Sequence, residues 1–287
     1  MEIPLYESET GNTSVPIDGP YPNLKQSWIL LVYYLGTIVL VSGIFSVLGI
    51  NSLIFENTLR YGLLLFVAYR NKHKTNDRVF IRYRNRNSLS LILPLIPATL
   101  GLGIVVSVID GLLLFVLPMP EWLEKIFENI VTGNQTADLI LFIVLVGPVG
   151  EELIMRGVIC EGLLRNTTPA KAIVWSSIIF SVFHLNPWQG ITAFVFGCFV
   201  GWLYWKTRSI IPCILVHVFH NSIVVVKNTF WVDLHSEKAS FLSKKDFFSG
   251  SELLYLVVGL IAFLIGYYLI KLALIVVPEE PKTRRED

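Results

Sequence analysis

Long runs of apolar residues alternate with short polar segments along most of the chain. A helix needs roughly 20 apolar residues to cross a hydrocarbon core about 30 Å thick, because every backbone polar group must be bonded within the segment. Eight stretches approach this length: 26–50, 52–69, 89–117, 137–164, 170–186, 190–206, 210–227 and 252–271. Glu56 and Arg60 interrupt the second stretch, so the count falls to seven if that stretch does not span. The pattern predicts an all-α fold, a polytopic transmembrane helix bundle of about eight spans.

The same pattern leaves both ends of the chain outside the predicted bundle. Residues 1–25 are polar and rich in Pro and Gly, with neither the basic start nor the apolar core of a secretory signal peptide. Residues 278–287 are mostly charged. We therefore expect a polar amino-terminal tail, one transmembrane bundle over 26–277 and a charged carboxy-terminal tail.

Composition narrows the class of protein further. Of the 287 residues, 53% are hydrophobic and 16% are charged, and the mean hydropathy is +0.61. A soluble domain carries about a quarter charged residues, so this composition excludes a disordered chain and an ordinary water-soluble enzyme. The net charge of +1 supplies no concentrated basic face for nucleic acid. The lipid bilayer is the expected partner, and no nucleic-acid partner is expected.

Lys and Arg are distributed unevenly between alternate predicted loops. They concentrate in segments 70–88 and 271–287, which fall on the same side of an eight-span bundle. Short loops rich in Lys and Arg remain in the cytoplasm. The distribution predicts a multi-pass protein of the cell membrane with both termini in the cytoplasm.

The fourth predicted span contains ionisable residues that are costly in a bilayer. Glu151, Glu152 and Arg156 fall within about one and a half helical turns, and each charge at the bilayer centre costs about 2.5–3.5 kcal/mol on insertion scales. Such groups normally face a bundle interior or a wet cavity and serve function. Glu152 and Arg156 share a helix face and are expected to pair, whereas Glu151 points about 100° away. Glu161, four residues before Arg165, is expected to form a surface ion pair at the end of the same helix.

Two further spans carry polar side chains inside the apolar slab. Phe180 precedes His184 by four residues in one span, and His217 lies on the face of another span that also carries Asn221. A rise of 1.5 Å per residue puts the two histidines about 12 to 20 Å from the polar ends of their spans. Neighbouring antiparallel helices would bring such side chains together. We therefore expect an active site between helices.

The order of these motifs resembles that of a known family. E-E-x-x-x-R, then F-x-x-x-H, then H-x-x-x-N, each on a separate apolar helix, resembles the CPBP family of intramembrane proteases. This family includes the CAAX prenyl endopeptidases of the Rce1 type and the bacterial Abi proteins. The similarity covers residues 137–228. It implies a CAAX prenyl protease-like intramembrane endopeptidase, a hydrolase that acts on a peptide or protein substrate.

The resemblance also implies a role for each motif residue. Glu151 with His184 activates a water, and His217 with Asn221 binds the oxyanion that forms on the substrate carbonyl. The physical chemistry agrees, because a buried carboxylate takes up a proton more readily and donors in a water-poor site stabilise developing negative charge. Supporting roles are expected for four further residues: Glu152, Arg156, Phe180 and His220.

A metal ion is the alternative chemistry for the same side chains. Glu151, His184 and His217 provide two imidazoles and one carboxylate, a ligand set that zinc peptidases also use. The H-E-x-x-H helix signature of many zinc peptidases is absent. We therefore prefer a reaction that requires no cofactor and retain a divalent metal such as zinc as the alternative.

A different class of function is compatible with the same fold. Some members of the resembled family are linked to self-protection against bacteriocins, so a non-catalytic membrane scaffold or bacteriocin self-immunity protein is the alternative to the enzyme. A protein without catalysis is free to lose the residues of the site. All four residues of the site are present here, which favours the endopeptidase.

Overall fold

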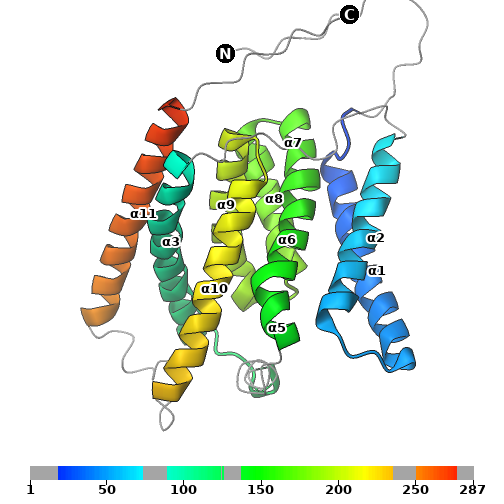
Figure 1. Ribbon diagram of the computed structural model, residues 1–287, viewed down its shortest axis with the longest axis horizontal. Helices are drawn as coiled ribbons and strands as arrows, with labels where there is room; N and C mark the ends of the chain where they lie inside the picture. The colour runs from blue at the N-terminus through cyan, green and yellow to red at the C-terminus, as the bar shows by residue number, and fades with distance from the viewer. Residues whose placement is uncertain (1–18, 74–88, 124, 126–136, 235–249, 277–287) are drawn as a thin grey trace, which may run out of the picture.

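The computed structural model describes residues 19–73, 89–123, 125, 137–234 and 250–276, and all structural statements refer to these residues (Figure 1). They form helices and no strand, so the predicted all-α fold is confirmed. The predicted tail 278–287 and most of the tail 1–25 lie outside the described residues. The long helices are α1 (Leu24–Leu48), α2 (Leu53–His73), α3 (Leu89–Val116), α8 (Pro169–Phe183), α9 (Pro187–Thr207), α10 (Ile211–Leu234) and α11 (Gly250–Val276).

Residues 137–166 form one continuous helical rod, called the central rod below. Its five parts are α5 (Ala137–Leu141), η1 (Phe142–Val146), α6 (Gly147–Glu152), η2 (Leu153–Cys160) and α7 (Glu161–Asn166). The two η segments are π-helical, with wider turns than an α-helix. Such turns are rare and occur frequently at functional sites. Here they flank α6, which carries both glutamates of the E-E-x-x-x-R motif.

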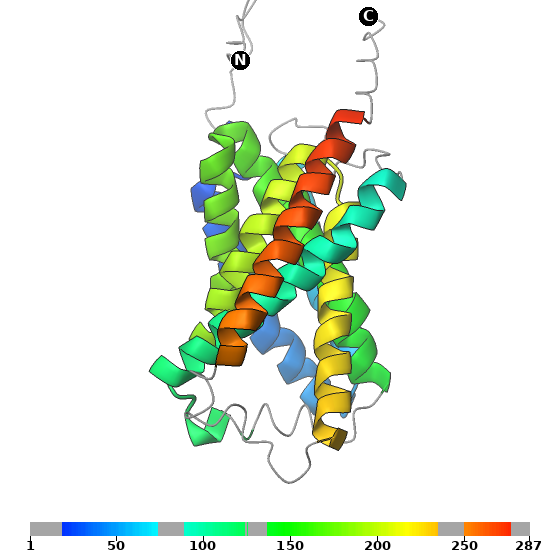
Figure 2. The same ribbon diagram turned by 90° about the vertical axis from the view of Figure 1, so that its left-hand side faces the viewer.

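The central rod lies between two groups of helices (Figure 1). The α1–α2 hairpin is on one side, α8, α9 and α10 are on the other, and α3 and α11 lie furthest from the hairpin. Figure 2 shows α11 crossing α3 at close range. A Cβ atom on Gly101 of α3 would lie 2.2 Å from the backbone nitrogen of Phe263 in α11. Small residues allow such close backbone approach, which supplies packing energy between helices in lipid.

The stretch 52–69, which ionisable residues interrupt, lies within the regular helix α2. Glu56 and Arg60 form an ion pair one turn apart, and the hydroxyl of Ser42 on α1 bonds to both. The two charged side chains are 16% and 12% exposed, respectively. Their mutual neutralisation explains how a helix with two charges packs against its apolar neighbour.

Among the described residues, three helices are long and apolar enough to cross a membrane by length and composition: Leu24–Leu48, Leu89–Val116 and Leu253–Ile275. Pro169–Phe183 and Ile211–Val226 are shorter apolar helices. Large apolar side chains such as Val47 and Ile275 remain exposed at 87% and 79%, as expected for surface that contacts lipid. The chain is a membrane protein, and the number of about eight spans stays a prediction.

The two described ends of the chain lie at the same end of the bundle. Helix α1 begins and α11 ends at the top of Figure 1. The side of the membrane that this end faces stays a prediction.

Candidate active site

The expected pair between Glu152 and Arg156 forms in the interior of the bundle. Arg156 Nη1 donates to Glu152 Oε1 at 2.9 Å, and the two residues are 1% and 0% exposed, respectively. Arg156 Nη2 also donates to the carbonyl oxygen of Gly197 on α9 at 3.2 Å. The guanidinium carbon lies 4.9 Å from the ring centroid of Phe180 on α8. Arg156 therefore ties the central rod to α8 and α9 as well as neutralising Glu152.

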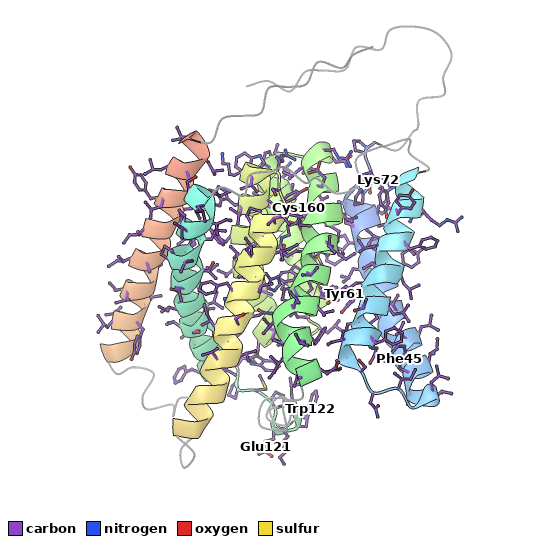
Figure 3. All side chains as sticks on the ribbon, in the orientation of Figure 1. Phe45, Tyr61, Lys72, Glu121, Trp122 and Cys160 are labelled. Atoms are coloured by element: carbon purple, nitrogen blue, oxygen red, sulfur yellow. The ribbon has the colours of Figure 1, made fainter. Side chains whose placement is uncertain are left out.

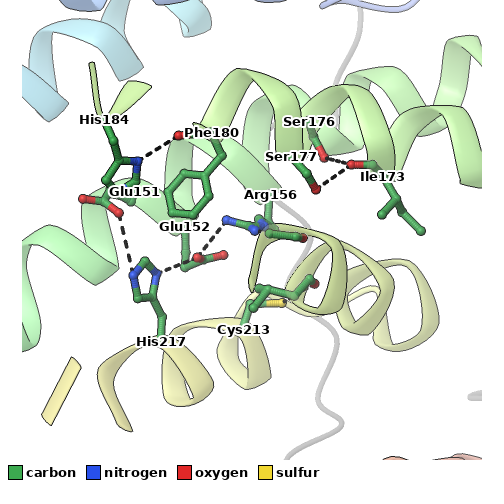
Figure 4. Close-up of polar contacts among 12 residues, drawn as sticks. Glu151, Glu152, Arg156, Ile173, Ser176, Ser177, Phe180, His184, Cys213 and His217 are labelled. Atoms are coloured by element: carbon green, nitrogen blue, oxygen red, sulfur yellow. Dashed lines mark hydrogen bonds and ion pairs between the residues drawn. The ribbon is translucent and has the colours of Figure 1, made fainter. Parts of the chain in front are cut away.

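His217 of α10 lies between the two glutamates of α6. Its Nδ1 is 2.7 Å from Glu152 Oε1, and its Nε2 is 3.7 Å from Glu151 Oε2 (Figure 4). His217 is 5% exposed, and the Glu151 side chain is 15% exposed. Glu151 and Glu152 point away from each other around the helix, and opposite edges of one imidazole contact them both. Glu151 thus has a partner on a different helix, as its position on the rod predicted.

His184 directly follows α8 as its C-cap residue, and its ring is held by that helix. His184 Nδ1 is 2.9 Å from the carbonyl oxygen of Phe180. A carbonyl oxygen only accepts hydrogen bonds, so Nδ1 carries the proton and Nε2 has the lone pair when the ring is neutral. Phe180 contacts both imidazoles edge-on, with ring centroids 4.9 Å from His184 and 6.0 Å from His217. Figure 4 shows the carboxylate of Glu151 directed toward the two rings.

Asn221 lies one turn beyond His217 on α10 and contacts a different part of the rod. Its Nδ2 donates to the carbonyl oxygen of Ile143 at 2.9 Å. Ile143 belongs to the π-helical segment η1, so this bond joins α10 to the wide turn that precedes the glutamates. One amide hydrogen is used in this bond, and Asn221 has a second.

His220 lies one residue before Asn221 and packs against α9 and α3. Its ring centroid is 4.8 Å from that of Phe196, which also contacts His217 at 4.9 Å. A Cβ atom on Gly103 of α3 would lie 3.6 Å from His220 Nδ1. His220 therefore borders the site through Phe196, and a supporting role for it stays a prediction.

Tyr61 is a member of the site that sequence reasoning missed. Its hydroxyl lies 3.5 Å from Glu151 Oε1, and the residue is 5% exposed. Figure 3 shows Tyr61 between α2 and the central rod. The only signal near it was the Glu56–Arg60 pair in an apolar stretch, which marked α2 as unusual without indicating which residue faces the site.

The geometry was also tested against the metal alternative. Within the described part of the chain, no group of three or more His, Cys, Asp or Glu side chains is arranged to hold a metal ion. Glu151, His184 and His217 are therefore not arranged as a three-ligand metal site in the described residues, and a divalent metal stays the alternative chemistry.

A second group of charges, called the Glu161 cluster, lies where α7 meets the end of α9. It consists of Glu161, Arg165, Tyr204 and Arg208. Glu161 Oε2 accepts from Tyr204 Oη at 3.0 Å and from Arg208 Nη1 at 3.2 Å, and its Oε1 lies 3.7 Å from Arg165 Nε. The expected Glu161–Arg165 pair forms. Its predicted surface position is wrong, because Glu161 is 1% exposed and packs against the end of α9.

Comparison with known proteins agrees with the motifs. Residues 134–223 match the family described as Rce1-like, type II CAAX prenyl endopeptidase. No curated protein and no solved structure matches the chain. The matched segment contains Glu151, His184, His217 and Asn221, whereas Tyr61 lies outside it. This segment of an all-helical membrane protein is therefore similar to the Rce1-like CAAX protease family.

Proposed function

We propose that the protein is an intramembrane endopeptidase that hydrolyses a peptide bond with a water activated by Glu151 and His184. His217 and Asn221 stabilise the oxyanion. The observation that carries this proposal is the position of Glu151, an acid inside a helix bundle that faces His217 Nε2 at 3.7 Å. The buried Glu152–Arg156 pair adjoins Glu151 on the same helical rod. Buried ionisable groups of this kind are expensive in a membrane protein and normally serve function.

His217 can act as a donor toward the site when both of its ring nitrogens carry a hydrogen. With Nδ1–H directed at Glu152, a protonated ring presents Nε2–H on the side of Glu151. His217 is therefore the donor for a developing negative oxygen.

The other imidazole is suited to the opposite role. The carbonyl of Phe180 orients His184 and fixes the proton on Nδ1, which leaves Nε2 as an acceptor. A water between Nε2 of His184 and the carboxylate of Glu151 can give up a proton as it attacks the substrate carbonyl. The difference between the two histidines follows from what each Nδ1 contacts, a carbonyl in one case and a carboxylate in the other.

The reaction then needs no further group. The water oxygen attacks the carbonyl carbon, and its proton passes to the Glu151–His184 pair. The tetrahedral oxyanion accepts hydrogen bonds from His217 Nε2–H and from the second amide hydrogen of Asn221. The proton is returned to the leaving amine as the bond breaks. Oxyanion donors in a water-poor site are each worth about 10² to 10³ in kcat.

The substrate class is proposed from the family description. The matched family is that of the type II CAAX prenyl endopeptidases. The first substrates to test are therefore membrane-bound peptides with a lipidated cysteine near the carboxy terminus. The same peptides without the lipid distinguish recognition of the lipid from recognition of the peptide.

The test is cleavage of these peptides by the purified protein in liposomes, followed by mass spectrometry. We expect cleavage by the wild type and loss of it in Glu151→Ala and His184→Ala. Glu161→Gln is the matched control, because it removes a buried carboxylate from the same rod without touching the site. Proteolysis that is unchanged in Glu151→Ala and His184→Ala would reject the proposal.

A further inference from the structure

Tyr61 contacts the carboxylate oxygen of Glu151 that His217 leaves free. Tyr61 Oη is 3.5 Å from Glu151 Oε1, whereas His217 Nε2 lies on the side of Oε2 at 3.7 Å. The two oxygens of one carboxylate are thus addressed from two helices, α2 and α10. Because Tyr61 is 5% exposed, its hydroxyl has little access to bulk water and Glu151 is its hydrogen-bond acceptor.

The ring of Tyr61 packs against the backbone of α6 and against a neighbouring aromatic ring. A Cβ atom on Gly150 would lie 2.2 Å from Tyr61 Cδ2, so the ring rests directly on the backbone of α6. Tyr34 of α1 stacks beside it, with centroids 6.4 Å apart and an interplanar angle of 14°. Tyr34 in turn stacks on Phe183 of α8 at 3.8 Å. This packing restricts the orientation of the phenol ring.

We propose that Tyr61 is a positioning residue for Glu151. The phenol O–H donates to Oε1 and restricts rotation of the carboxylate, so that Oε2 stays directed toward the space where the water is activated. The inference rests on the proposed function of Glu151 as a base. It adds a residue from α2 that lies outside the family-matched segment 134–223. It also gives the α1–α2 hairpin a part in the chemistry.

A purely structural role predicts a different outcome from the same substitution. Tyr61→Phe retains the ring, its stacking and its contact with Gly150, and removes only the hydroxyl. Tyr34→Phe is the matched control, since Tyr34 is a neighbouring tyrosine that is 7% exposed. If the hydroxyl serves only packing, the two variants behave alike. If it positions Glu151, only Tyr61→Phe affects turnover.

The experiment combines steady-state kinetics with infrared spectroscopy of the full-length protein in liposomes. We expect Tyr61→Phe to lower kcat about tenfold, the effect of one hydrogen bond to a charged group, with KM unchanged. We expect Tyr34→Phe to leave kcat within about twofold. The difference spectrum of wild type against Glu151→Gln isolates the carboxylate band of Glu151, and this band should shift in Tyr61→Phe and not in Tyr34→Phe.

The outcomes separate this inference from the proposed function. A kcat that Tyr61→Phe leaves unchanged, or that both variants reduce equally, overturns the positioning role. An unshifted Glu151 band also overturns it. If the wild type cleaves and Glu151→Gln does not, the proposed function stands whatever Tyr61→Phe does. If the wild type cleaves nothing, the proposed function fails and the infrared band alone decides whether Tyr61 holds Glu151.

Discussion

The central rod carries two buried groups of charges whose partners differ in kind. Glu161 on α7 is surrounded by two arginines and a tyrosine hydroxyl. Guanidinium groups are always charged in proteins, so Glu161 faces two permanent positive charges. Of the two glutamates on α6, Glu152 pairs with Arg156, and His217 contacts both carboxylates. The second group therefore contains an imidazole, a side chain that can exchange protons, where the first contains permanent cations and a phenol.

The two groups also differ in exposure, and the Glu151 side chain is the more exposed of the two glutamates. The Glu161 side chain is 1% exposed and Glu151 is 15% exposed. A carboxylate that is closed in by permanent cations contributes to stability, whereas one that is partly open and faces an imidazole can reach a substrate. Burial of a glutamate in a membrane protein is therefore no indication of catalysis by itself. The identity of its partners distinguishes the two roles.

The largest expected effect comes from neutralising the carboxylate on the reactive side of this comparison. Glu151→Gln preserves shape and removes the base, so we expect kcat/KM to fall by about 10³ to 10⁴. The unfolding temperature should stay the same or rise, because one buried charge is removed. Peptide cleavage and thermal unfolding of the same preparation measure both quantities. Retained cleavage would show that Glu151 is no more reactive than Glu161.

The corresponding change in the Glu161 cluster should affect stability instead. Glu161→Gln leaves Arg208 and Arg165 without their carboxylate, and breaking a buried ion pair costs about 3 kcal/mol or more. We expect a loss close to about 3 kcal/mol, because the side chains of Arg208 and Arg165 are 28% and 20% exposed, respectively, and reach water. Denaturant unfolding should report this loss. Activity per folded molecule should remain within about twofold of wild type, and a larger drop would contradict the division between the two groups.

Asn221→Ala tests the oxyanion side of the reactive group. We expect kcat to fall about 10²-fold, because one donor to the developing charge is lost. The bond to the carbonyl of Ile143 is lost as well, which should lower stability by about 1 kcal/mol. Ser222→Ala is the control on the same helix, since its hydroxyl bonds only to the local carbonyl of Val218. Equal turnover in the two variants would remove Asn221 from the mechanism.

The smallest effect comes from removing a tyrosine hydroxyl beside Glu161. Tyr204→Phe deletes the 3.0 Å bond to that carboxylate and should lower the free energy of unfolding by about 1.5 kcal/mol. Turnover should not change. Tyr61→Phe is the same substitution beside Glu151, and it is expected to act on kcat instead. If the two substitutions act alike, tyrosine hydroxyls serve packing at both glutamates.

Local features of the site followed from the sequence because they depend on the helix alone. The pairing of Glu152 with Arg156 requires only that residues four apart share a helix face. The different direction of Glu151, about 100° around the helix from Glu152, follows from the same geometry. Helix formation over 52–69 also followed from apolar character, despite the charges, because Glu56 and Arg60 lie one turn apart and neutralise each other.

The contacts between distant segments could not be predicted in this way. Nothing in the spacing of the motifs indicates that His217 lies between both glutamates or that Asn221 bonds to the wide turn η1. The partners of Glu161 from α9 convert a predicted surface pair into a buried cluster. Each of these contacts joins residues on different helices. The spacing of such residues along the chain does not determine the distance between them, because that distance depends on how the helices pack.

The sequence alone thus determined the helical class of the protein, its membrane character, and the set of polar side chains within its apolar helices. These properties depend on composition and on a period of 3.6 residues, both of which are local. The tertiary structure decided which polar groups meet, including the contact of Tyr61 with Glu151. Packing between helices controls those meetings, because the rotation and depth of each helix depend on its neighbours rather than on its own residues.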